Sequence, residues 1–293
     1  MKHVILVNPV SGTKKGSKYG FIIKKLLYKN NIDASIYESK EKGDLTNIVK
    51  ELVKKEQCRF YSIGGDGTLN EVVTGIIGSD SEIVVLACGT GNDFIRSISK
   101  YKSLRKIILT SLTTSPTKCD VILVNNKYYC INILSVGFDS LVGRNVDKFR
   151  WVPFVNGTFK YNLSIIYTLL QNKDFNIKLR INNKIYKGLH TLVAISNGKY
   201  YGGGVCPNPN ARVDDGVLDV CIIDKTSIFK KIQLLPKYKK GTHTNINLVN
   251  FEKTDKLTIA SNESFPISVD GEVIYSNKLK CEIIKNKINI IHT

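Results

Sequence analysis

Residues 61–72, Tyr-Ser-Ile-Gly-Gly-Asp-Gly-Thr-Leu-Asn-Glu-Val, decide the fold of the first part of this chain. A largely apolar, strand-like stretch over 58–63 precedes three glycines in four positions, and apolar residues at helical spacing follow from Leu69. This pattern predicts a buried strand, a glycine-rich turn and the N-terminus of a helix. Glycine lets the backbone approach a ligand closely, and the free N–H groups of a helix N-terminus bind anions, most often phosphate.

Asp66 lies inside this turn. A carboxylate would repel a bare phosphate, so we expect Asp66 to hold Mg²⁺ or to order a neighbouring loop. The turn lacks the Gly-Lys-Ser/Thr of a Walker A loop and does not match Gly-x-Gly-x-x-Gly. Gly-Asp-Gly is also common in ordinary tight turns, so the turn alone leaves a purely structural role open.

The composition favours an anionic partner but does not identify it. The 293 residues are enough for two domains, and Lys and Arg exceed Asp and Glu to give a formal net charge of +18. The lysines are spread along the chain, which equally fits an ordinary solvated surface, and no nucleic-acid recognition motif is present.

Seven scattered cysteines without a C-x-x-C pair indicate reduced thiols in a cytosolic protein. Neither a signal peptide nor a membrane-spanning helix is predicted.

The pattern of elements changes along the chain. Apolar runs alternate with amphipathic helical stretches up to residue 118, which predicts a doubly wound parallel sheet, an α/β nucleotide domain. Short strand candidates dominate from residue 119, among them 127–134, 278–284 and 287–291, with one helical stretch at 160–170. They predict a mainly antiparallel β-sandwich. We therefore predict domains at 1–118 and 119–293, and leave open whether the last strand returns to the first domain.

Two further polar turns follow strands of the first domain. Asn8–Gly12 follows the strand at 3–7, and Gly89–Asp93 follows the strand at 83–87. Ligands bind at the carboxyl ends of the strands in open α/β sheets. Three polar turns at that edge predict a nucleotide-binding crevice.

The second domain carries two groups of carboxylates. Asp214 and Asp215 follow the triple glycine 202–204, and carboxylates with turn carbonyls suit Mg²⁺ or Ca²⁺, although a plain Asp-Gly hairpin turn also fits. Asp270-Gly271-Glu272 ends another predicted strand. Glu272 has a catalytic role only if the fold brings it to the crevice.

Seven motifs occur in order along nearly the whole chain. They are Asn8–Gly12, Gly64–Val72, Gly89–Phe94, Gly137–Asp139, Asn197–Gly204, Asp215–Asp219 and Asp270–Glu272. As a set they resemble the diacylglycerol kinase catalytic family, in its bacterial lipid kinase branch, which is similar to sphingosine and ceramide kinases. Gly-Gly-Asp-Gly-Thr alone is shared with NAD kinases and phosphofructokinases, whereas Leu-Asn-Glu and the C-terminal Asp-Gly-Glu favour lipid kinases.

The resemblance implies that ATP binds the first domain, that the second is β-sandwich-like, and that the active site lies between them. The implied ATP contacts are Asn8, Pro9, Val10, Ser11, Gly12, Ser39, Gly65, Asp66, Gly67, Thr68, Leu69, Asn70, Glu71 and Thr90. The family's general base falls on Glu272, and Asp66 would position a catalytic Mg²⁺. A structural Mg²⁺ site falls on Asp215 and the carbonyls of Arg212 and Val217. The chain departs from the family at Ala87, where proline is frequent.

The resulting hypothesis is an ATP-dependent lipid kinase that converts diacylglycerol to phosphatidic acid. It would be cytoplasmic and peripherally bound at the inner face of the membrane; a homodimer is left open. Aromatic and basic residues at 150–155 and 159–167 suit an interfacial surface, although an aromatic helix face is more often core. Phosphatidylglycerol, a sphingoid base or NAD as acceptor, and an inactive lipid- or nucleotide-binding regulator, remain alternatives.

Overall fold

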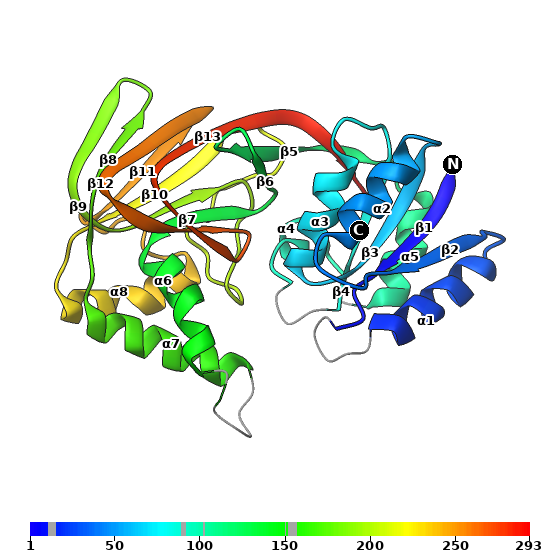
Figure 1. Cartoon of the computed structure of the whole chain (residues 1–293), viewed down its shortest axis with the longest axis horizontal. Coiled ribbons are helices and arrows are strands. Elements are labelled where there is room, and N and C mark those ends of the chain that lie inside the picture. Colours follow the sequence, from blue (N-terminus) through cyan, green and yellow to red (C-terminus); the bar gives the residue numbers. More distant parts are fainter. Residues whose placement is uncertain (11–15, 89–91, 102, 150, 152–156) are drawn as a thin grey trace. The chain divides into compact units, whose positions relative to one another are not determined.

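The computed structural model describes residues 1–10, 16–88, 92–101, 103–149, 151 and 157–293. They form two compact units. Unit 1 comprises residues 1–121, 213–215 and 284–293, and unit 2 comprises residues 122–212 and 216–283. Unit 1 therefore consists of three separate stretches of the chain. Figure 1 shows the first of them starting in blue and the last in red.

Unit 1 is a parallel sheet with helices on its faces (Figure 1). Its strands run in the order β2-β1-β3-β4-β13, and the last is represented by the C-terminal end of β13. The strands are β1 (Lys2–Val7), β2 (Ala34–Glu38), β3 (Cys58–Gly64), β4 (Glu82–Ala87) and β13 (Glu272–Ile290). The helices are α1 (Gly16–Tyr28), α2 (Asp44–Val53), α3 (Asp66–Ile76), α4 (Ile95–Ile98) and α5 (Leu104–Thr113). This confirms the predicted α/β nucleotide-domain fold.

The central strand shows why the apolar runs form this sheet. All seven residues of β3 are buried. The strand pairs in parallel with β1 on one side and β4 on the other. A strand covered on both faces has no solvent side, so its residues do not alternate between apolar and polar. Its one charged side chain, Arg59, is buried in an ion pair with Glu82 at 2.6 Å.

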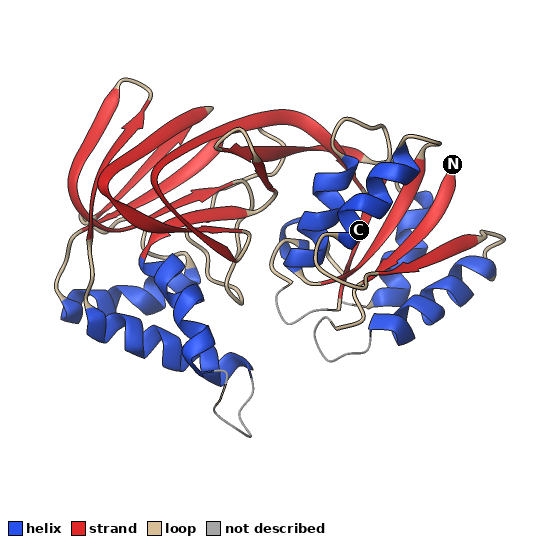
Figure 2. Ribbon diagram, in the orientation of Figure 1, coloured by secondary structure: helices blue, strands red, loops and turns tan. Residues whose placement is uncertain are grey.

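Unit 2 is an antiparallel β structure, and Figure 2 draws its strands in red. Its strand order is β11-β10-β9-β7-β12-β13, while β8 pairs with both β12 and β9 and β5 pairs with β13 and β6. The strands are β5 (Thr117–Val124), β6 (Tyr128–Cys130), β7 (Ile133–Gly137), β8 (Phe175–Ile181), β9 (Lys184–Ser196), β10 (Leu218–Asp224), β11 (Val249–Thr254) and β12 (Lys256–Val269). The predicted antiparallel β-sandwich class is confirmed.

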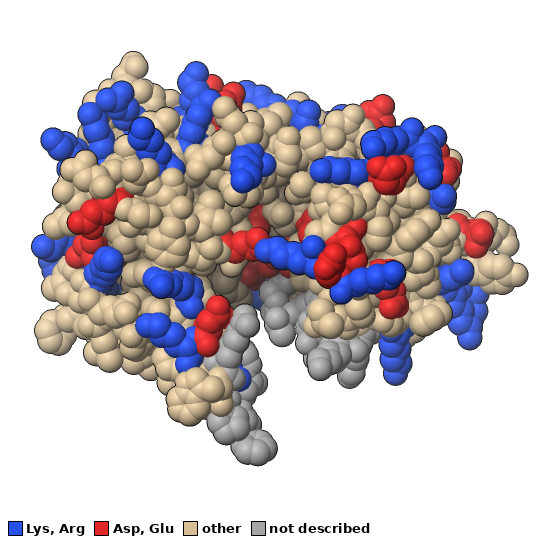
Figure 3. Space-filling view, viewed as in Figure 1, with Lys and Arg blue, Asp and Glu red and all other residues tan. Residues whose placement is uncertain are grey.

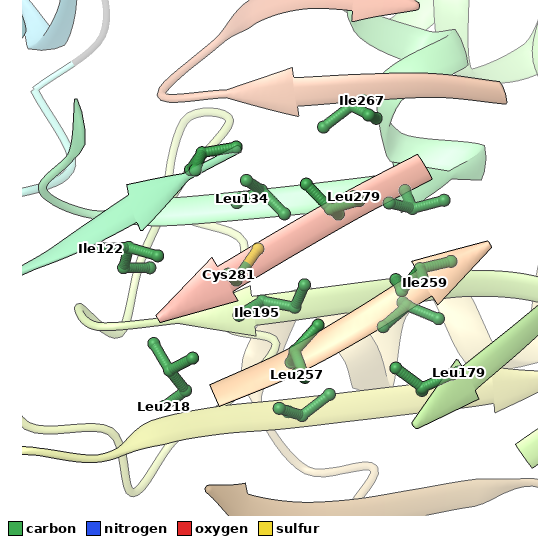
Figure 4. Close-up of a cluster of buried hydrophobic side chains, with 14 of the residues drawn as sticks. Ile122, Leu134, Leu179, Ile195, Leu218, Leu257, Ile259, Ile267, Leu279 and Cys281 are labelled. Atoms are coloured by element: carbon green, nitrogen blue, oxygen red, sulfur yellow. The ribbon is translucent and has the colours of Figure 1, made fainter. Parts of the chain in front are cut away.

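The core of unit 2 lies among these strands (Figure 4). Apolar side chains from β7, β8, β9, β12 and β13 meet there, among them Leu134, Leu179, Ile195, Leu257 and Leu279, each at most 2% exposed. Alternate residues of β8 point inward, as its burial alternation shows. The fold of this unit therefore rests on period-two patterning.

Unit 2 also contains helices that the sequence analysis did not predict. One helix is predicted from the sequence at 160–170, and α7 (Gly157–Gln171) confirms it. The structure adds α6 (Phe138–Asn145), a 3₁₀ turn η1 (Val146–Phe149) and α8 (Ile228–Lys240). The first two are short, and α8 contains Pro236 in its interior, a residue that normally ends a helical pattern. Among the described residues, no helix is long and apolar enough to cross a membrane.

Candidate active site

The turn between β3 and α3 is built for close backbone approach. A Cβ on Gly64 would overlap the Thr68 side chain, so only glycine fits there. Gly65 precedes α3 in extended conformation and provides no side-chain cap, while a Cβ on Gly67 would meet no atom of the described residues within 4 Å. The described part of the chain thus leaves space beside Gly67 in the first turn of α3, where the positive end of the helix suits an anion.

Asp66 connects this turn to the segment after β4. Its Oδ1 accepts the N–H of Asp93 at 3.2 Å and the N–H of Phe94 at 3.3 Å, and its Oδ2 lies 3.3 Å from the same Asp93 nitrogen. Asp93 is itself buried and pairs with Arg96 at 3.3 Å. Of the two roles expected for Asp66, ordering a neighbouring loop is the one that these contacts display.

The other proposed ATP contacts of unit 1 follow the carboxyl ends of β1 and β2. Asn8 donates its N–H to Ile63 O at 3.3 Å, and its Oδ1 accepts the N–H of Val10 at 3.2 Å. Pro9 lies between them, and Ser39 donates its N–H to Val7 O at 2.9 Å. The structure brings these residues and the β3–α3 turn to one edge of the sheet. Ser11, Gly12 and Thr90 lie outside the described residues, as do residues 150 and 152–155 of the predicted interfacial stretch.

Several of the proposed ATP contacts in α3 do not have a side chain that is available to a ligand. Thr68 and Leu69 are buried, so their backbone alone is available to a ligand at this helix end. Asn70 is partly buried on the next turn. Glu71 accepts the N–H of Leu45 through Oε2 at 3.2 Å, at the start of α2. Its carboxylate therefore stabilises a helix N-terminus, where negative charge is favourable.

In unit 2, the Asp270-Gly271-Glu272 turn is fixed by the side chain of its first residue. Asp270 accepts the N–H groups of Ile131, Asn132 and Ile133 at 2.8, 3.1 and 3.3 Å. It also adopts a left-handed φ of 46°, which Asp tolerates better than most residues. Glu272, the first residue of β13, is exposed. The turn therefore holds an exposed carboxylate on a firmly bonded backbone.

Residues 131 and 132, whose N–H groups bind Asp270, also hold a second predicted motif, Asn197–Gly204. Asn197 donates through Nδ2 to Ile131 O at 2.7 Å, and its N–H reaches Asn132 O at 2.9 Å. Asn132 donates through Nδ2 to Tyr200 O at 2.7 Å. Residues 131–132 thus join the Asn197–Tyr200 turn to the Asp270 turn. The sequence analysis missed Asn132, which matched none of the quoted motifs.

A buried carboxyl marks the helical side of unit 2. Asp139 of α6 accepts the Tyr238 hydroxyl of α8 at 2.8 Å, and Tyr238 and Tyr201 share a hydrogen bond of 2.9 Å. Asp139 also lines a cavity whose other walls are mostly apolar, including Phe138, Leu192 and Leu234. Burial raises the pKa of Asp139 to about 7, and burial and Asp139 together raise that of Tyr238 well above its ordinary range.

Comparisons with known proteins match both parts of the chain. Residues 2–124 match the model of the diacylglycerol kinase catalytic domain, and residues 132–292 match that of the YegS C-terminal NAD kinase beta sandwich-like domain. This chain belongs to the bacterial lipid kinase branch of the diacylglycerol kinase family.

Individual members of the family resemble the chain over most of its length. A diacylglycerol kinase of Staphylococcus haemolyticus is 26% identical over 98% of this chain and 86% of its own. A Staphylococcus aureus (strain MSSA476) protein, provisionally named a lipid kinase, is 27% identical over 88% of this chain and 86% of its own. A solved Bacillus anthracis structure, provisionally named a diacylglycerol kinase, has a TM-score of 0.81 at 24% identity, covering 100% of this chain and 97% of that one, which shows the shared fold.

Membership of a kinase family implies ATP and a divalent metal, and the residues of this chain can be tested for their fit. The β3–α3 turn fits a phosphate chain because Gly67 leaves its approach open. The predicted structural metal site remains a prediction, since Asp215 belongs to unit 1 and Arg212 and Val217 to unit 2. No group of three or more His, Cys, Asp or Glu that could hold a metal occurs among the described residues. The predicted metal site consists of one carboxylate and two backbone carbonyls, so it would not count as a group of three or more such side chains.

Proposed function

We propose that this lipid kinase transfers the γ-phosphoryl group of ATP to the hydroxyl of diacylglycerol and produces phosphatidic acid. The observation that carries the proposal is the exposed Glu272 carboxylate, held on a turn that Asp270 fixes by three backbone hydrogen bonds. A general base must hold its position to take a proton from a reacting hydroxyl. The S. haemolyticus relative, named a diacylglycerol kinase, supports the choice of lipid.

Each proposed role uses a feature of one unit. The open N-terminus of α3 binds phosphate oxygens through backbone N–H groups, and Asn8 and Ser39 contact the nucleotide at the same sheet edge. Asp66 keeps the segment after β4 in place through the N–H groups of Asp93 and Phe94. Glu272 accepts the hydroxyl proton. A bound Mg²⁺ would supply charge compensation on the phosphoryl oxygens, which phosphoryl transfer chiefly requires.

Because diacylglycerol lies in a membrane, the proposed enzyme must reach its substrate at the membrane surface. We include peripheral association with the inner face of the membrane in the proposal. Exposed apolar side chains on α7 and α8 support it, among them Phe159, Leu170 and Phe229. On the face drawn in Figure 3, Lys and Arg are scattered over the surface and form no continuous stripe, which argues against nucleic acid as the partner.

The test is transfer of labelled γ-phosphate from ATP to a panel of acceptors. The panel contains diacylglycerol, phosphatidylglycerol, sphingosine and undecaprenol in mixed micelles, and NAD in solution. Label in phosphatidic acid above all other products supports the proposal. Label in another lipid would keep the lipid kinase and replace its substrate, whereas label only in NADP would overturn the lipid reaction.

A further inference from the structure

The outer face of the sheet in unit 2 carries cations that none of the seven sequence motifs contains. On β8, Ile177 and Leu179 point inward and are at most 2% exposed, so Lys178 and Arg180 point outward. Lys178 lies directly opposite Lys187 of β9. Like charges that lie opposite each other on one face repel and destabilise a sheet. This arrangement therefore has a cost that a role in binding would explain.

The same group of cations extends across the sheet to β13, and cross-strand pairing arranges the outward residues in two rows (Figure 1). From β9 through β8 and β12 to β13, the first row is Lys187, Lys178, Ala260 and Lys278, and the second row is Ile185, Arg180, Thr258 and Lys280. Neighbouring strands lie about 4.8 Å apart and alternate residues of one strand about 6.7 Å apart. The backbone positions of the five cations therefore lie within about 14 by 7 Å. We call these five residues the cationic face.

Carboxylates do not neutralise this face. In the described parts of the chain, no Asp or Glu lies within ion-pair distance of four of the five cations, and the fifth, Lys280, has Glu282 at 3.9 Å. Elsewhere in the unit, opposite charges lie opposite each other: Asp219 of β10 pairs with Lys253 of β11 at 3.1 Å. Lysines often protect a free sheet edge, but β8 and β12 are paired on both sides. Edge protection therefore does not explain these cations.

Two apolar side chains border the cations. Ile185 lies opposite Arg180, and Leu189 lies opposite Asn176 on the same outward face. They are 58% and 42% exposed. None of the outward residues in the two rows is aromatic. Membrane interfaces and single-stranded nucleic acids are bound largely through aromatic side chains, whereas an acidic protein segment needs only cations and an aliphatic contact.

We propose that the cationic face binds an acidic segment of a partner protein, in which a run of Asp or Glu lies next to an apolar residue. The carboxylates contact the cations, and the Arg180 guanidinium can bind one of them through two parallel hydrogen bonds. The apolar residue packs on Ile185 and Leu189. Because β8 and β12 have no free edge, the segment binds through side chains and adds no strand. The proposed reaction uses none of these residues, and binding is measured without ATP or lipid.

The test is fluorescence anisotropy of the full chain with a labelled peptide in which a run of glutamates is followed by two leucines. The face variant is Lys178→Gln/Arg180→Gln/Lys187→Gln. The matched control, which removes the same charge from exposed positions of the same unit, is Lys225→Gln/Lys230→Gln/Lys239→Gln. From the strength of exposed ion pairs and their screening by salt, we expect about tenfold weaker binding by the face variant, and binding within about twofold of the wild type by the control.

A second variant separates the apolar contact from the charge. Ile185→Ser/Leu189→Ser should bind the leucine peptide a few-fold more weakly and bind unchanged a peptide with serines in place of the leucines. Urea unfolding checks the folding of every variant. The face variant should be at least as stable as the wild type, because it removes like charges that lie opposite each other.

Several outcomes would overturn the proposal. Equal losses in the face variant and the control would show that binding follows net charge alone, and absence of peptide binding by the wild type would remove the acidic partner. An oligothymidylate of the same charge, or phosphatidylglycerol vesicles, serve as competing probes. If either bound more tightly than the peptide and lost as much affinity in the face variant, the face would belong to a nucleic acid or to a membrane.

Discussion

Asp270 is the residue on which the geometry of the proposed base depends. Its carboxylate receives the backbone N–H groups of residues 131–133 and the thiol of Cys130 at 3.1 Å. Burial and the neighbouring Asp270 raise the pKa of Cys130 well above its ordinary range, so the thiol stays protonated and donates. In the proposed reaction Asp270 would be a positioning residue, because it would act on Glu272 through the backbone of the turn.

Asp270→Asn is expected to lower both stability and turnover. Asparagine tolerates the left-handed φ but offers one acceptor oxygen in place of two, so buried N–H groups lose a partner, at about 1–3 kcal/mol. Urea unfolding measures the first effect. A merely structural role would lower stability and leave kcat per folded molecule unchanged. We expect kcat to fall with KM for ATP unchanged, and a wild-type kcat in the folded variant would contradict the positioning role.

Gly67 tests the proposed approach of a phosphate to α3. A Cβ at this position meets no atom within 4 Å in the parts of the chain that the structure describes. Replacing glycine where the backbone permits it changes stability by about 0.4–1 kcal/mol in the favourable direction. Gly67→Ala should therefore fold at least as well as the wild type. It should raise KM for ATP and leave KM for the lipid unchanged, as steady-state kinetics with each substrate varied would show. An unchanged KM for ATP would place the nucleotide elsewhere.

At the scale of elements, α2 and α3 pack closely at a glycine. A Cβ on Gly75 would lie 2.7 Å from Val49 Cβ and 2.9 Å from the Thr46 carbonyl oxygen. Alanine normally favours a helix interior by about 1 kcal/mol over glycine. Here we expect Gly75→Ala to destabilise the chain by about 1–3 kcal/mol, because overpacking dominates. Urea unfolding would measure it, and a more stable variant would contradict the close packing.

The contact of α6 with α8 makes stability depend on pH. Burial raises the pKa of Asp139 from an ordinary 3.8 to about 7 in the folded chain, so folding favours its protonated form. This stabilisation is complete below the ordinary pKa and is lost as pH rises through about 7. The free energy of unfolding should therefore fall, relative to Asp139→Asn, between about pH 4 and pH 7.

Asparagine at position 139 keeps an acceptor for Tyr238 and cannot ionise, so the variant should lack this decline. Urea unfolding at several pH values measures the difference. Asp255→Asn, at an exposed carboxylate of the same unit, is the control and should follow the wild type. Parallel curves for the wild type and Asp139→Asn would show that the Asp139 carboxyl titrates normally.

The elements of this chain were predictable where local patterns decide them. The β3–α3 turn follows from an apolar run, glycines and helical spacing, all within 58–76. By contrast, residues 127–134 were predicted as one strand, and the structure divides them into β6 and β7. The break lies at 131–132, where Asp270, 138 residues from Asn132, takes the backbone N–H groups. Only tertiary structure reveals such a partner.

At the scale of the whole molecule, the fold class was predictable, whereas the path of the chain was predictable only in part, because the return of the last strand to the first domain was left open. Candidate strands at 278–284 and 287–291 belong to a single strand, β13, whose residues Asn289 and Ile290 pair with β4 of unit 1. Residues 213–215 also return to unit 1. Strand order depends on pairings across long sequence separations, which periodicity does not encode.

The central claim is that Glu272 acts as the base in phosphoryl transfer to a lipid hydroxyl. The measurement that tests it most directly is kcat for phosphatidic acid formation by Glu272→Gln against Glu263→Gln. Glu263 is an exposed carboxylate of the same unit and serves as the matched control. We predict a loss of about 10²–10⁴-fold for Glu272→Gln, with wild-type urea unfolding, and no loss for the control. Full activity of Glu272→Gln would contradict the account.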